Sequence, residues 1–136
     1  MLRQDDVVRT LVVLECWRQG KDFGSSQVPL MIMGCLANRV RLGWSNWFET
    51  LKNIPKYSAL LKQPNRDIFP DLWEPNFIRL LQSVEGVMEG SMIDPACGGV
   101  FWADLRHIDN PWFLAKVLND PLRSPCANLN SFTIFK

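Results

Sequence analysis

The chain has 136 residues, of which 47% are hydrophobic, and a formal net charge of +1, so residues 1–136 have the size and composition of one globular domain. This charge balance excludes a strongly basic nucleic-acid binder, and no run reaches the ~18 apolar residues of a membrane span. The N-terminus lacks the apolar stretch and cleavage site of a secretory signal, so we expect synthesis in the cytoplasm.

Apolar residues at helical spacing predict three long helices and one short helix in the first two thirds of the chain. Their expected bounds are Asp5–Gln19, Val28 or Pro29 to Leu42, Trp47–Lys52, and Pro75 to Gly90, with loops over Lys21–Gln27 and Gln63–Glu74. Proline suits the first turn of a helix, and glycine suits the position just after its end. In the second helix we expect one inner stripe, where Gly34 and Ala37 would let another helix approach. That stripe consists of Leu30, Met33, Gly34, Ala37 and Val40.

The sequence changes character after Gly90. Asp94-Pro95 and Gly98-Gly99 mark turns, and Val100–Trp102 is a short apolar run. We expect a short helix over Pro111–Leu118 and a terminal strand over Ser131–Phe135. The predicted fold is therefore mainly α, with a small β element near its end.

The four cysteines, at positions 16, 35, 97 and 126, form no CxxC pair, and His107 is the only histidine. A structural zinc site needs closely spaced ligand pairs, so we expect no metal site. Cys16 and Cys35 lie in helical apolar patterns and are interpreted as small buried hydrophobic residues. Cys97 and Cys126 could pair in an oxidising compartment, and the sequence leaves that open.

Glu15 lies on the apolar side of the first predicted helix, on the same stripe as Val8, Leu11 and Val12. A carboxyl group among apolar side chains loses hydration, which raises its pKa. An acid that keeps its proton near neutral pH can protonate the leaving oxygen of a glycosidic bond. An ion pair with Arg18 would explain the same placement, so the pattern alone leaves both roles open.

Several segments, taken in their order along the chain, carry a resemblance to a known family. They are TLVVLECWRQG (Thr10–Gly20), GCLANRVRLG (Gly34–Gly43), KYSAL (Lys56–Leu60), QPNR (Gln63–Arg66), DPACGGVFWAD (Asp94–Asp104), NPW (Asn110–Trp112) and Phe132–Lys136. In this order they resemble the SleB-like, spore-cortex-lytic cell-wall hydrolases. Glu15 then matches the family's glutamate, and Asn38, Arg39 and Val40 match the end of its second helix.

This resemblance implies a lysozyme-like α+β fold that cleaves peptidoglycan between N-acetylmuramic acid and N-acetylglucosamine without a cofactor. It implies a lytic transglycosylase with Glu15 as general acid and then base, because the sugar's own 6-hydroxyl replaces the second carboxylate of ordinary glycosidases. The implied glycan contacts are Tyr57, Ser58, Gly98, Gly99, Phe101 and Trp102. The expected partner is the glycan strand of the cell wall, reached by a monomer after release or export.

The residues themselves leave alternatives for several of these contacts. Tyr57 could be a loop aromatic, with Ser58 as a capping residue, and Gly98-Gly99 could be a plain turn. If Phe101 and Trp102 are extended, one side chain enters the core and the other can stack on a sugar ring. Trp112 is expected in the core.

Two other classes of protein compete with an enzyme. Lys56, Leu60 and Ala103 stand where the family has glutamine, tryptophan and histidine, which favours a non-catalytic wall-binding module of the same fold. A phage or virion part that contacts the wall is the third class. The presence of Glu15 favours the enzyme.

Overall fold

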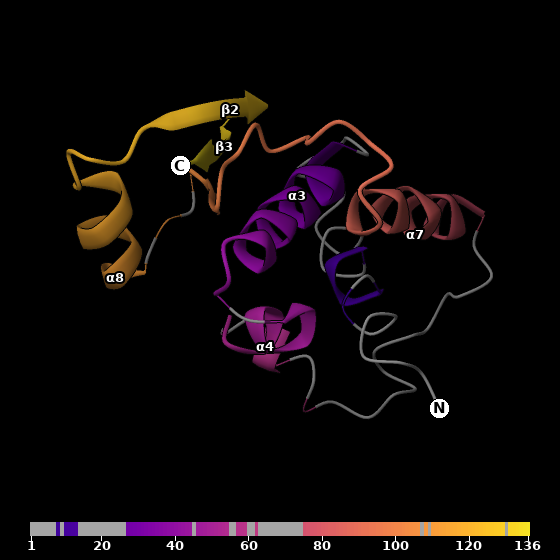
Figure 1. The fold of residues 1–136 in the computed structure, drawn as a ribbon. Helices are drawn as coiled ribbons and strands as arrows, with labels where there is room; N and C mark the ends of the chain where they lie inside the picture. Colours follow the sequence, from indigo (N-terminus) through magenta and orange to yellow (C-terminus); the bar gives the residue numbers. More distant parts are fainter. Residues whose placement is uncertain are drawn as a thin grey trace.

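The computed structural model describes residues 8, 10–13, 27–44, 46–54, 57–59, 62, 75–106, 108, 110–129 and 131–136. Helix α3 (Gln27–Arg41) crosses the middle of the molecule (Figure 1). Helix α7 (Pro75–Met88) packs on one side of it, a three-stranded sheet lies on another, and α4 (Trp47–Lys52) lies near its C-terminal end. The fold is thus a mixture of helices with a small antiparallel sheet, as the sequence predicted at this coarse level.

Local sequence explains where the helices begin and end. Asn46 caps α4, since its side-chain oxygen accepts a hydrogen bond from the Glu49 N–H at 2.9 Å. Gly43 and Gly90 follow α3 and α7 with positive φ angles of 81° and 74°, a conformation that glycine adopts without a steric penalty. The predictions for α3, α4 and α7 are confirmed to within two residues at each end.

Helix α3 is buried on more than one face, so the expectation of a single inner stripe was too narrow. Its buried residues are Val28, Pro29, Met31, Ile32, Met33, Gly34, Cys35, Leu36 and Asn38. A helix that is apolar nearly all round belongs inside a domain. At Gly34 itself the close neighbour is not a helix, because a Cβ there would lie 3.0 Å from Ala96 Cβ and 3.0 Å from Asp94 Oδ1. The neighbour at Gly34 is the turn before the sheet.

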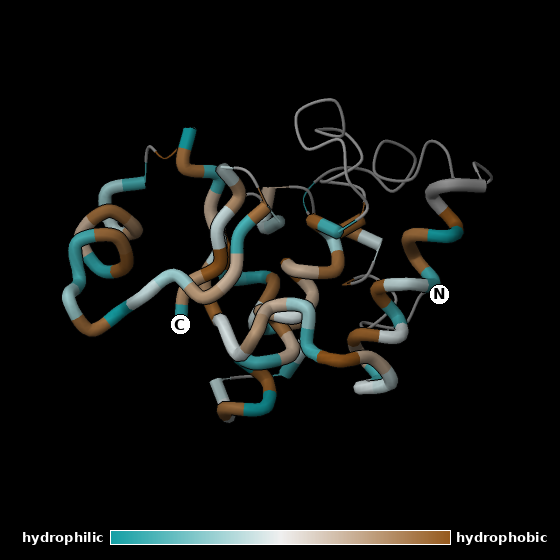
Figure 2. The backbone as a smooth tube through the Cα atoms, turned by 90° about the horizontal axis from the view of Figure 1, so that it is seen from above, coloured by the Kyte–Doolittle hydropathy of each residue, from teal (hydrophilic) through white to brown (hydrophobic). Residues whose placement is uncertain are grey.

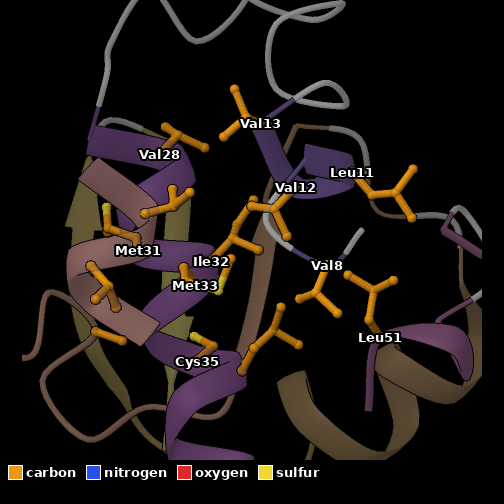
Figure 3. Close-up of a cluster of buried hydrophobic side chains, with 14 of the residues drawn as sticks. Val8, Leu11, Val12, Val13, Val28, Met31, Ile32, Met33, Cys35 and Leu51 are labelled. Carbon is orange, nitrogen blue, oxygen red and sulfur yellow. The ribbon is translucent and has the colours of Figure 1, made fainter. Parts of the chain in front are cut away.

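The main core joins α3 to the described part of the first predicted helix. Residues 8 and 10–13 are helical and buried, and Figure 3 shows Val8 and Val12 between Leu51 on one side and Ile32 and Met33 on the other. The remainder of the first predicted helix and the predicted loops over 21–26 and 63–74 lie outside the described residues. Each large apolar side chain that is buried in the main core stabilises the fold by about 1.5–3 kcal/mol relative to an exposed one.

The sheet has the strand order β1-β3-β2, with β1 (Phe101–Asp104) and β2 (Pro125–Leu129) each antiparallel to β3 (Phe132–Phe135). The expected terminal strand is confirmed as β3, and β1 begins within the short apolar run Val100–Trp102, for which no element had been predicted from the sequence. Strand β2 was not predicted. Its register on β3 is irregular between Pro125 and Ala127, which fits an edge strand that begins with proline.

The helix expected over Pro111–Leu118 is present as α8 (Pro111–Phe113) followed by a π-helical turn, η1 (Leu114–Leu118). Asn110 caps it, because its side-chain oxygen accepts from the N–H groups of Trp112 and Phe113. Figure 2, which colours the backbone by hydropathy, shows that this segment contains both hydrophobic and hydrophilic residues, and Val117 packs in a second small core with Val100, Phe101 and Phe135. Among the described residues, no helix is both long and apolar enough to cross a membrane.

Candidate functional site

The C-terminal half of α3 is joined by side-chain hydrogen bonds to the turn that precedes β1. Asn38 Nδ2 donates to Asp94 Oδ2 at 2.9 Å and to the Gly99 carbonyl oxygen at 2.9 Å. Arg41 donates to Asn38 Oδ1, so the buried amide uses both of its ends. We call Asn38, Asp94 and Gly99 the Asn38 junction.

Asp94 organises the turn inside this junction. Its carboxylate accepts from the N–H of Ala96 at 2.8 Å and of Gly98 at 2.7 Å, in addition to Asn38. Partial burial alone would raise the pKa of Asp94, but these hydrogen bonds and the charge of Arg41 outweigh it and hold the pKa below its usual value. A carboxylate held in this way is a structural acceptor, which agrees with the expectation that Asp94 serves the turn.

The next residue, Arg39, leads from the junction to a group of aromatic rings. Arg39 Nε donates to the Val100 carbonyl oxygen at 2.7 Å. Its guanidinium lies 5.3 Å from the ring centres of both Trp44 and Phe101 and 4.9 Å from that of Trp102. Burial lowers the pKa of Arg39 to about 10, so it stays charged at neutral pH.

The end of α3 explains why Trp44 meets Arg39. The Gly43 N–H donates to the Val40 carbonyl at 3.0 Å, and the Trp44 N–H donates to the Arg39 carbonyl at 3.0 Å. This pair of bonds is a Schellman motif, in which the residue after the glycine contacts the residue that begins the last turn. Here that contact is the Trp44–Arg39 cation–π pair, and the sequence signal for it was Gly43.

Two exposed tryptophans, a buried phenylalanine and two arginines form what we call the aromatic–arginine cluster: Arg39, Trp44, Phe101, Trp112 and Arg123. Phe101 lies at its centre, with ring centres 5.7 Å from Trp44 and 5.8 Å from Trp112. The Arg123 guanidinium lies 4.4 Å from the Phe101 ring centre. Trp112 is 55% exposed, so its expected place in the core was wrong: α8 carries it at the edge of the second small core.

Glu15 lies outside the described residues, and so do Lys56, Leu60 and His107. Three residues that share its predicted stripe are described: Val8, Leu11 and Val12 are fully buried in the main core. Val13 and Thr10 are buried as well, so this segment is covered on more than one side.

Tyr57 is not placed to stack on a glycan as the resemblance implies, whereas the contact expected of Ser58 stays a prediction. Tyr57 has 0% of its surface exposed and belongs to the main core, so its ring offers no face for stacking on a sugar. Ser58 is half-buried, and its N–H donates to the Ile54 carbonyl at 2.9 Å. We therefore assign the Tyr57 ring to core packing, which is neither the glycan contact nor the loop aromatic that the sequence had suggested.

Gly98 and Gly99 serve the turn and the sheet. Gly98 is exposed and has a φ of 82°, which favours glycine. Gly99 is buried, and a Cβ on it would lie 2.1 Å from Ile134 Cγ2. Close packing of this backbone on β3 accounts for Gly99, which leaves no room there for the expected approach of a glycan.

Phe101 and Trp102 alternate in direction along β1, as expected of extended residues. Phe101 is 6% exposed and packs in the second small core, whereas Trp102 is half-buried against the main core. Both rings meet Arg39, so the two faces of the strand are linked by one guanidinium. The exposed stacking faces near β1 belong to Trp44 and Trp112 instead.

The cysteines separate by exposure. Cys35 is fully buried, as expected, and burial raises the pKa of its thiol well above the usual range. Cys97 is exposed, and Cys126 is half-buried with its Sγ 3.4 Å from the Ala96 carbonyl oxygen. Within the described ranges, no group of three histidine, cysteine or acidic side chains could hold a metal ion.

Comparisons of the chain with models of protein families, with curated proteins and with solved structures found no match.

Proposed function

We propose that the protein is a peptidoglycan-cleaving enzyme of the lytic transglycosylase type, with Glu15 as its general acid and base. The carrying observation is the Asn38 junction. Two segments that carry the resemblance, GCLANRVRLG and DPACGGVFWAD, meet in the structure through hydrogen bonds from Asn38 to Asp94 and Gly99 and from Arg39 to Val100. Asn38 and Arg39, which the resemblance singled out on the second helix, therefore make long-range contacts to the second of these segments.

The surroundings predicted for Glu15 support the same proposal. Periodicity assigns it to the stripe of Val8, Leu11 and Val12, and these three side chains are fully buried. A carboxyl group that continues such a stripe would lose hydration and keep its proton to a higher pH. A lysozyme-like arrangement of the fold is part of the proposal.

The proposed reaction needs one carboxyl group. Glu15 gives its proton to the glycosidic oxygen as the bond from the muramic acid C1 to that oxygen breaks. The 6-hydroxyl oxygen of the same muramic acid forms the new bond to C1, and its proton goes to the Glu15 carboxylate. The acid is restored, no water is consumed, and the product carries an anhydro end.

Purified sacculi test this proposal. The wild type is expected to reduce the turbidity of a sacculus suspension and to release muropeptides with anhydro ends, whereas Glu15→Gln releases none. Glu49→Gln is the matched control, since the partly exposed side chain of Glu49 forms an ion pair with Lys52 on the surface of α4. Equal inactivity of wild type and Glu15→Gln on sacculi of several wall chemistries would contradict the proposal.

A second candidate is a wall-binding module without catalysis, and the two exposed tryptophans favour it. Trp44 and Trp112 offer large planar apolar faces to solvent, which suits stacking on sugars. Co-sedimentation with sacculi separates the candidates, because a module binds without releasing muropeptides. An enzyme does both.

A further inference from the structure

The aromatic–arginine cluster exposes surface that folding alone would bury. Trp44 is 49% exposed and Trp112 is 55% exposed, although each ring already packs against Phe101. Tryptophan is a rigid side chain with a large apolar face, so little conformational entropy is lost when a ligand stacks on it. Two such faces on either flank of one buried ring form a platform set by three elements: the end of α3, β1 and α8.

Arg39 gives this platform a positive charge that is not neutralised by the carboxylates of the described residues. It is half-buried, and none of the carboxylates that the structure describes forms an ion pair with it. Its Nε is used by Val100, while the rest of its guanidinium lies among the aromatic rings. A partly desolvated guanidinium beside open stacking faces is suited to a ligand carboxylate.

Arg123, from the segment between η1 and β2, also contacts the platform, but its guanidinium is bound by backbone carbonyl groups. Its Nε donates to the Lys116 carbonyl at 3.2 Å, its Nη1 donates to the Lys136 carbonyl at 3.2 Å, and Asp120 lies 3.9 Å away. Because Arg123 already has these hydrogen-bond partners and a nearby carboxylate, it is less available to bind a ligand carboxylate. Arg39 is therefore the residue from which we expect charge recognition.

We propose that the aromatic–arginine cluster binds a glycan strand that carries carboxylate groups. Trp44 and Trp112 stack on sugar rings, and Arg39 recognises the carboxylate. This binding site deepens the proposed function, and the choice of a glycan as its ligand rests on that function. It concerns binding by these residues and needs no bond to be broken.

Charge argues against a nucleic acid as the occupant. Binding to a phosphate backbone needs several cations along a groove, and the cluster holds two, one of which is already paired. The whole chain carries a net charge of only +1. Binding to a nucleic acid or to an anionic membrane is measured as an alternative outcome of the test.

Titration calorimetry with two soluble probes tests the proposal. The first is a mixture of muropeptide-bearing glycan fragments, and the second is a neutral N-acetylglucosamine oligomer of similar length. All titrations use the Glu15→Gln background, so that binding is measured apart from cleavage. Trp44→Ala and Trp112→Ala are each expected to weaken binding of the carboxylated fragments about tenfold. Ile93→Ala, which removes an even more exposed apolar side chain from a loop, is expected to bind as the parent does.

The role of Arg39 is tested by comparing the affinities for the two probes, the carboxylated fragments and the neutral oligomer. The parent should bind the carboxylated fragments more tightly than the neutral oligomer, Arg39→Gln should lose this preference, and Arg39→Lys should keep part of it. Tryptophan variants that bind like the parent would overturn the proposal. So would a cluster-dependent affinity for single-stranded DNA or anionic vesicles that exceeds the affinity for the fragments. A wild-type protein that does not cleave sacculi, while the Glu15→Gln parent still binds the fragments through the cluster, would instead count against the proposed reaction and leave this binding proposal standing.

Discussion

The side-chain amide of Asn38 lies 2.9 Å from Asp94 Oδ2 and 2.9 Å from the Gly99 carbonyl oxygen, and it thereby ties α3 to the turn before β1. Asn38 is 2% exposed, so water cannot replace either bond. The same turn carries Val100 and Phe101 into the second small core. One buried amide thus links the helical part of the structure to its sheet.

Replacing Asn38 by alanine is expected to lower the free energy of unfolding by about 2–3 kcal/mol, because it leaves the Gly99 carbonyl without its donor. Denaturant unfolding followed by circular dichroism measures this change. Asn128→Ala is the control, since Asn128 is exposed on β2, and its effect should stay within about 0.5 kcal/mol. Equal stabilities for the two variants would mean that the junction does not hold the turn.

Asp94 makes the stability depend on pH. Its pKa is lower in the folded protein than in the unfolded chain, so its contribution is fully present above the unfolded value of about 3.9. That contribution is lost as the pH falls through the folded pKa. The difference in unfolding free energy between wild type and Asp94→Asn should therefore be constant near neutral pH and shrink below about pH 4. A difference that stays constant down to pH 2 would contradict the assigned hydrogen bonds.

Gly99→Ala and Gly98→Ala are expected to differ in cost. A Cβ at Gly99 meets Ile134 Cγ2 at 2.1 Å, so overpacking should destabilise the protein by about 3 kcal/mol. At Gly98 the nearest outside atom is Lys136 Cε at 3.6 Å, and only the positive φ angle opposes alanine, at about 1 kcal/mol. Thermal unfolding of both variants measures the order. A larger loss for Gly98→Ala would refute the packing explanation.

The three cysteines that the structure describes should react in the order of their exposure. Alkylation of the native protein with iodoacetamide, followed by peptide mass mapping, is expected to modify Cys97 before Cys126 and Cys35. Cys35 should react only after unfolding, because it is fully buried and burial raises the pKa of its thiol. Modification of Cys35 at the rate of Cys97 in the native protein would show that the core around α3 is not closed.

The helix bounds could be predicted because local residues set them. Asn46, Gly43 and Gly90 act through caps and backbone conformation within one turn of each helix. Strand β2 could not be predicted, since Pro125, Cys126, Ala127 and Asn128 have no preference for extended chain. It exists because it pairs with β3, a contact that depends on the fold as a whole.

The candidate site divides in the same way. The contact between Asn38 and Asp94 joins residues that the resemblance had singled out separately, although no local pattern links positions 56 residues apart. The places of Trp44 and Trp112 depend on where α3 and α8 end up around Phe101, so counting aromatic residues could not find them. Tyr57 is the opposite case: its polar neighbours in sequence indicated an accessible ring, but the ring is fully buried.

The most direct test of the proposed function is the origin of the atoms at the cleaved end. Sacculi are digested in oxygen-labelled water, and the muramic acid ends of the released fragments are analysed by mass. Transglycosylation uses the sugar's own hydroxyl, so the wild type should give anhydro ends that carry no label, and Glu15→Gln should give no new ends. Labelled reducing ends would show hydrolysis by water and contradict the account, as would unchanged cleavage by Glu15→Gln.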